Sequence, residues 1–118
     1  MDQVFIEGLE VETLIGVYDW ERTIRQRVIF DLEMDYDCRV AAEGDALDKA
    51  LDYSAVAEMV RSITDVASYQ LLETLAEEVA SALLANFAIS RIQLRLSKPG
   101  AVPAARNVGI KIVRMSEK

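Results

Sequence analysis

The sequence predicts a single α+β domain over residues 1–118, with a four-stranded antiparallel sheet and two helices on one of its faces. Near each end of the chain, apolar and polar residues alternate with the period of two that is typical of strands. The middle of the chain instead has apolar residues at helical spacing. The resulting order of strand, strand, helix, helix, strand, strand is typical of α+β domains. A chain of 118 residues with only two prolines and five glycines fits one compact unit.

The first two predicted strands form a hairpin-like pair. The first strand starts around residues 4–6 and continues through Leu9, Val11 and Thr13, and Gly8 indicates a bulge within it. The second strand spans residues 28–37 and has its apolar residues on one side: Val28, Phe30, Leu32, Met34 and Tyr36. The connection over residues 16–22 can therefore carry functional side chains.

The middle of the chain predicts a loop followed by two helices. Small and charged residues over 41–51 indicate the loop. Asp52 or Ser54 can cap the first helix, whose apolar positions are Val56, Met59, Val60 and Ile63. The second helix has a longer apolar stripe and should cover one face of the sheet: Leu72, Leu75, Ala76, Val79, Ala80, Leu83 and Phe87.

The last two predicted strands enclose a Pro-Gly turn. The third strand, 92–96, ends at Ser97-Lys98-Pro99-Gly100, where Pro-Gly favours a type II turn, and the fourth strand spans 108–113. A four-stranded sheet has two free edges, which invite pairing. The strand pattern leaves two outcomes open: neighbouring copies join their edges into a barrel, or helices and loops shield the edges of a monomer.

Composition excludes several classes of function. With 13 basic and 20 acidic residues, the formal charge of -7 disfavours a nucleic-acid partner. Asp2, Glu7 and Glu10 interrupt the N-terminal segment, so it does not resemble a signal peptide. No stretch approaches the ~18 apolar residues of a membrane span. We therefore expect a cytoplasmic protein without a membrane partner.

The chain contains no histidine and only one cysteine, Cys38. Catalytic zinc usually takes His or Cys ligands, and nucleophilic Ser or Cys catalysis usually relies on a His base. We therefore expect no metal, no internal disulfide and no such nucleophile. Carboxylates, lysine, tyrosine and backbone groups remain for any chemistry.

Four short segments resemble those of the dihydroneopterin aldolases. They are residues 15–21, 51–53, 71–73 and 96–101, which occur in the same order and extend the similarity over almost the whole chain. The resemblance implies the tunnelling fold, in which subunits join their sheets into a barrel and two rings stack, typically as a homo-octamer with sites at subunit interfaces.

The resemblance also implies a reaction in folate biosynthesis. This is the retro-aldol cleavage of 7,8-dihydroneopterin, a pterin, to 6-hydroxymethyl-7,8-dihydropterin and glycolaldehyde. No cofactor is implied, because the C6=N5 bond of the substrate can accept the electrons that a Schiff base would otherwise accept. Members commonly also act as isomerases that epimerise the side chain at C2′.

Glu73, Leu72 and Lys98 receive roles from this resemblance. The glutamate that matches Glu73 binds N3-H and the 2-amino group of the pterin, and Leu72 contributes its backbone. Lys98 matches the acid-base residue near N5. By position alone, Glu73 would be a first-turn acid that favours the helix dipole, and Lys98 a solvated charge.

Glu21 and Tyr53 complete the implied site. Glu21 matches a residue near the lysine and the trihydroxypropyl chain of the substrate, although by itself it would be an ordinary exposed acid. Tyr53 matches a tyrosine at the site of an adjacent subunit that supports proton delivery. Without the resemblance, Tyr53 would be a packing residue.

Two other functions are compatible with this residue set. An epimerase acting on dihydroneopterin triphosphate shares much of this residue set and would need positive charge, for which Arg22, Arg25 and Arg27 are candidates. A non-catalytic pterin-binding ring is the alternative of another class.

We expect Tyr18 and Trp20 to pack around the first connection. The acidic residues that alternate along 31–37 should form a solvated sheet face and no cation site.

Overall fold

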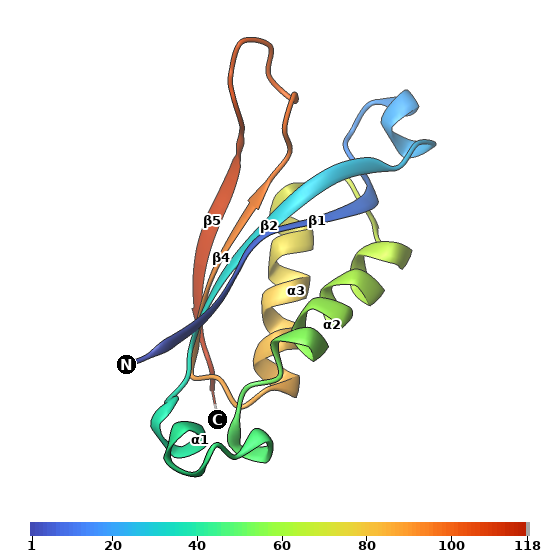
Figure 1. Ribbon diagram of the computed structural model, residues 1–118. Coiled ribbons are helices and arrows are strands. Elements are labelled where there is room, and N and C mark those ends of the chain that lie inside the picture. The colour runs from blue at the N-terminus through green and yellow to red at the C-terminus, as the bar shows by residue number, and fades with distance from the viewer. Residues whose placement is uncertain (118) are drawn as a thin grey trace.

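The computed structural model describes residues 1–117 and shows one twisted sheet with two long helices on the same face (Figure 1). The spatial order of the strands is β3-β1-β2-β4-β5. Their bounds are β1 Gln3–Ile15, β2 Gln26–Asp35, β3 Ser68–Tyr69, β4 Arg91–Ser97 and β5 Gly109–Met115. The α+β class and the helices on one face are confirmed.

The sheet contains one strand more than predicted. β1, β2, β4 and β5 are antiparallel neighbours, as expected. The additional strand β3 pairs in parallel with Leu14 and Ile15 at the end of β1. The prediction of four strands missed β3, because a strand of two residues is too short to show an alternating pattern.

The predicted bulge in β1 is present. The pairing register shifts between Ile6, which lies opposite Leu32, and Leu9, which lies opposite Phe30. Gly8 has φ +69°, a conformation that favours glycine. Its N–H donates to a side-chain oxygen of Asp31 at 2.8 Å. The shift keeps the apolar residues on both sides of the bulge facing the helices.

The two long helices form as predicted. α2, Tyr53–Val66, is capped by Asp52, whose carboxylate accepts the N–H of Ala55 at 3.0 Å. α3 spans Leu72–Asn86, and the middle of its predicted apolar stripe is buried against the sheet: Leu75, Ala76, Val79, Ala80 and Leu83. The core therefore lies between the helices and the apolar face of the sheet.

The segment predicted as a loop over 41–51 contains two short helices. α1 spans Arg39–Gly44, and η2, a 3-10 helix, spans Leu47–Lys49. Neither has a buried residue, so no apolar periodicity indicated them. β2 also ends at Asp35, two residues before its predicted end, because it lies opposite Gln3, where β1 begins. No helix within residues 1–117 is long and apolar enough to cross a membrane.

Candidate active site

The connection between β1 and β2 turns Glu21 toward the interior. It contains the 3-10 helix η1, Asp19–Arg22. The Tyr18 N–H donates to a carboxylate oxygen of Glu21 at 3.2 Å, and the Glu21 N–H donates to the Tyr18 carbonyl at 2.9 Å. Only 6% of Glu21 is exposed. The interpretation of Glu21 as an ordinary exposed acid is therefore wrong.

Gly16 provides the space in which the Glu21 carboxylate lies. A Cβ atom on Gly16 would lie 2.3 Å from the carboxyl carbon of Glu21, and Gly16 has φ +127°. Any side chain at this position would both strain the backbone and displace the carboxylate. The pattern of the sequence does not distinguish Gly16 from other loop residues; its place directly after a predicted strand was the available signal.

Lys98 follows β4 and points to Glu21. The Ala101 N–H donates to the Lys98 carbonyl at 3.3 Å across Pro99 and Gly100. Gly100 has φ +81°, as the predicted type II turn requires. The Lys98 ammonium donates to a carboxylate oxygen of Glu21 at 2.6 Å, and the two side chains are only 14% and 8% exposed. The two residues thus form a shielded ion pair, and Lys98 is not the solvated charge expected by default.

The environment of Glu21 favours its charged form. The hydrogen bond from Lys98 is the largest cause and lowers the pKa of Glu21 to about 2, against an opposing effect of burial. Hydrogen bonds from the Tyr18 backbone and from Gln26 act in the same direction as Lys98. The Gln26 amide donates to the carboxylate at 3.3 Å and to the Ile15 carbonyl at 2.8 Å. Sequence reasoning missed Gln26, since nothing in its pattern distinguishes it from other polar residues at a strand end.

The first turn of α3 begins close to this pair. The Gly16 N–H donates to the Tyr69 carbonyl at 3.2 Å, and α3 starts three residues after Tyr69. Glu73 follows Tyr69 by four residues, so about 14 Å of chain at most separates the two positions. Leu71 precedes the helix and provides no side-chain cap for its first N–H groups. Glu73 is exposed at this helix start.

Tyr53 is a predicted site residue that lies away from the Glu21–Lys98 pair of the same chain. It is the first residue of α2 and is 62% exposed. α2 begins at the end of the molecule opposite the β1–β2 connection (Figure 1). β3 follows the other end of α2, so the length of this helix, roughly 20 Å, separates Tyr53 from β3. Within one chain, the structure unites Glu21 with Lys98 and leaves Tyr53 apart.

A family model described as dihydroneopterin aldolase matches residues 4–113. The chain belongs to the dihydroneopterin aldolase family. The dihydroneopterin aldolase of Escherichia coli strain K12 is 52% identical over 114 residues, which cover 97% of this chain and 93% of that protein. The dihydroneopterin aldolase of Haemophilus influenzae is 46% identical, with 97% of each chain covered.

A solved structure agrees with this assignment. The crystal structure of E. coli dihydroneopterin aldolase in complex with neopterin superposes with a TM-score of 0.94 and 52% sequence identity, covering 97% of this chain and 99% of that one. Dihydroneopterin aldolases are aldehyde-lyases, so this chain is an enzyme of that class, and a role in folate biosynthesis fits it.

The aromatic side chains beside the Glu21–Lys98 pair do not enter the core. The rings of Tyr18 and Trp20 stack on each other, with centroids 6.4 Å apart and planes inclined by 5°. They are 64% and 59% exposed. The two residues flank Asp19 next to the inward-facing Glu21 and lie outside the interior of the chain. The expected packing around the connection is therefore limited to the two rings.

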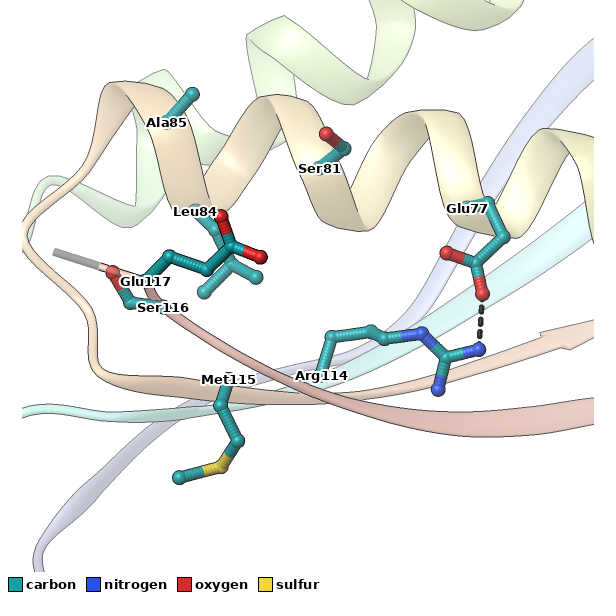
Figure 2. Close-up of a pocket in the computed structure, with 8 residues that line it drawn as sticks. All are labelled: Glu77, Ser81, Leu84, Ala85, Arg114, Met115, Ser116 and Glu117. Atoms are coloured by element: carbon teal, nitrogen blue, oxygen red, sulfur yellow. Dashed lines mark hydrogen bonds and ion pairs between the residues drawn. The ribbon is translucent and has the colours of Figure 1, made fainter.

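A hollow on the surface of the molecule lies away from the Glu21–Lys98 pair, between α3 and the end of β5 (Figure 2). An ion pair of Glu77 with Arg114 lies at one side of it. The hollow is lined by Glu77, Ser81, Leu84, Ala85, Arg114, Met115, Ser116 and Glu117. None of the predicted site residues is among them.

The acidic residues of β2 do not converge. Glu33 accepts a hydrogen bond from Gln93, and Asp35 accepts one from Gln3 and pairs with Arg91. Within residues 1–117, no group of three or more His, Cys, Asp or Glu side chains is arranged to hold a metal ion. The carboxylates thus spread along the strand as predicted, but the side chain of Asp35 is only 15% exposed, so the row is not solvated throughout.

Proposed function

We propose that the chain catalyses the retro-aldol cleavage of 7,8-dihydroneopterin, with Glu73 binding the pterin and Lys98 transferring protons, and that the reaction needs no metal or organic cofactor. The observation that carries this proposal is the shielded Lys98–Glu21 pair, 2.6 Å from nitrogen to oxygen, beside the segment that begins α3. The neopterin bound to the E. coli relative supports a pterin as the ligand.

The first turn of α3 fits the flat edge of a pterin. The N3-H and 2-amino group form two parallel donors, which one carboxylate can accept in bidentate geometry. Glu73 offers an exposed carboxylate there. The uncapped N–H groups of the same turn, including that of Leu72, can donate to O4 of the pterin. These groups bind and orient the ring without taking part in bond breaking.

Lys98 then serves the proton transfers. Breaking the C1′–C2′ bond converts the C2′ hydroxyl into the aldehyde of glycolaldehyde, with loss of its proton. The electron pair of the broken bond forms a C6=C1′ double bond while N5 takes up a proton, which gives an enamine. Protonation at C1′ and release of the proton on N5 restore the C6=N5 bond of the product. Glu21 stays ionised and orients the ammonium, because its pKa is about 2.

A second subunit would complete the site with Tyr53. The outer edge of β1 from Gln3 to Thr13 has no partner strand within residues 1–117, and β5 forms the other edge of the sheet. Exposed apolar side chains occur on both edge strands, with Phe5 66% and Met115 63% exposed. Free edges with apolar side chains favour pairing between copies. We propose a homo-octamer in the cytoplasm with sites at its subunit interfaces.

The three arginines that could bind a triphosphate are already engaged. Arg22 donates to backbone carbonyls, Arg25 pairs with Asp65, and Arg27 pairs with Glu10. This favours the unphosphorylated substrate over the triphosphate. Epimerisation at C2′ follows from the same chemistry, because glycolaldehyde can turn over and add back to the enamine before it leaves.

Two substitutions test the roles. Lys98→Ala should lower kcat by roughly a hundredfold or more while neopterin still binds, because acid-base catalysis contributes about 10²–10⁴-fold. Glu73→Ala should raise the Kd for neopterin about a hundredfold, because it removes charge-assisted hydrogen bonds worth about 3 kcal/mol. Stopped-flow kinetics and fluorescence titration measure the two effects. Wild-type values for both variants would refute the assignment.

A further inference from the structure

We propose that Arg22 is a positioning residue that fixes the Glu21–Lys98 pair relative to the first turn of α3. The inference rests on the proposed function, because it assigns Arg22 the task of aligning the acid-base group with the pterin anchor. Arg22 would touch neither the substrate nor the reacting atoms.

Three acceptors from two segments surround the Arg22 guanidinium. One nitrogen donates to the Gly16 carbonyl at 3.1 Å and to the Tyr69 carbonyl at 2.8 Å. The other donates to the Ser68 hydroxyl. Arg22 directly follows Glu21 in η1, so the guanidinium connects the element that holds the carboxylate to strand β3.

These contacts complete a continuous path between the two halves of the site. Lys98 at the end of β4 binds Glu21 in η1, Arg22 in η1 binds Tyr69 in β3, and α3 begins three residues later. β3 pairs with only two residues of β1, so its own ladder fixes it weakly. The planar fork of arginine can serve several acceptors at once, which makes it suited to this position.

Arg25 offers a matched control in the same connection. It lies three residues after Arg22 and also binds backbone carbonyls, those of Asp65 at 3.1 Å and Glu12 at 2.6 Å. It also pairs with the Asp65 carboxylate at 3.3 Å. Asp65 lies at the end of α2, and none of these contacts involves η1, β3 or α3.

The kinetic test compares Arg22→Gln, Arg22→Lys and Arg25→Gln with the wild-type chain. Arg22→Gln should lower kcat about tenfold and leave the Kd for neopterin unchanged, since small misalignments of a reacting group cost up to about 10²-fold in rate. Arg22→Lys should recover part of the loss, and Arg25→Gln should keep wild-type kcat. An unchanged kcat in Arg22→Gln, or an equal loss in Arg25→Gln, would overturn the inference.

Hydrogen exchange gives a readout that does not depend on activity. The Gly16 amide donates to Tyr69, so its exchange should accelerate about tenfold in Arg22→Gln and stay unchanged in Arg25→Gln. If the wild-type chain released no glycolaldehyde, the proposed function would fail and this exchange would decide the inference alone. Equal exchange in all the variants would overturn it.

Discussion

At the scale of single residues, Glu21 shows how one hydrogen bond can outweigh burial. Removing a carboxylate from water favours its neutral form, yet the hydrogen bond from Lys98 has the larger effect and lowers the pKa of Glu21 to about 2. Glu21 therefore has no proton to give at neutral pH. Its use lies in orienting the ammonium, and proton transfer falls to Lys98 and the groups around the substrate.

This pKa predicts an acid-dependent loss of stability. The folded state lowers the pKa of Glu21 from 4.5 to about 2, so the stabilisation from its charged form is fully present above pH 4.5 and is lost as the pH falls toward 2. Glu21→Gln should flatten this part of the curve of unfolding free energy against pH, measured with urea.

A second carboxylate titrates in the same range and provides the control. Hydrogen bonds from Arg39 lower the pKa of Asp37 to about 2, but both residues are on the surface. Its contribution should therefore weaken in high salt, whereas that of Glu21 should persist. If Glu21→Gln and the wild-type chain lost stability in parallel between pH 4.5 and 2, the ion pair would contribute nothing.

Sequence reasoning reached part of this arrangement. Glu21 and Lys98 are 77 residues apart, and no periodicity connects them, so only their resemblance to family segments indicated a common site. Gly16 and Gln26 escaped notice as supporting residues, because their importance depends on where the Glu21 carboxylate lies in space. Contacts of this kind do not appear in the pattern of a single sequence.

At the scale of elements, length decided what could be predicted. The apolar patterns of β2 and α3 extend over many residues and predicted the correct faces. β3, α1 and η2 are too short to bury a repeating face, so the sequence did not indicate them. β3 nevertheless lies at the site, since it pairs with the end of β1 just before α3 begins.

Gly16→Ala tests the link between this connection and Glu21. The new Cβ would lie within 3 Å of the Glu21 carboxylate and would require an unfavourable φ. We expect a loss of about 1–3 kcal/mol in the free energy of unfolding and a lower kcat. Gly44→Ala is the control, because among residues 1–117 no atom beyond its chain neighbours and its own helix backbone lies within 4 Å of its Cβ position. Equal effects of both substitutions on kcat would contradict the role of Gly16.

At the scale of the whole molecule, residues 1–117 leave one face of the sheet uncovered and form two edge strands (Figure 1). α2 and α3 cover one face only, and the other bears charged residues together with exposed Phe5 and Val113. Tyr53 lies at the far end of α2 from the Glu21–Lys98 pair. An assembly that joins sheet edges can bring the α2 end of one subunit to the pair of the next.

Mixing two inactive variants tests this assembly. Tyr53→Ala retains Lys98, and Lys98→Ala retains Tyr53, so some interfaces of a mixed oligomer contain both wild-type residues. Random mixing by co-expression should restore roughly a quarter of the wild-type activity if two chains build each site. Purified oligomers of each single variant provide the baseline. Activity no higher than that baseline would indicate a site within one chain.

The most direct test of the whole account is a product analysis of the purified chain. Incubation with 7,8-dihydroneopterin and excess EDTA should yield 6-hydroxymethyl-7,8-dihydropterin and glycolaldehyde in equal amounts, separated by chromatography, at the rate seen without chelator. Loss of cleavage that returns when a divalent metal is added back would contradict the metal-free mechanism. Intact substrate under every condition would contradict the aldolase itself.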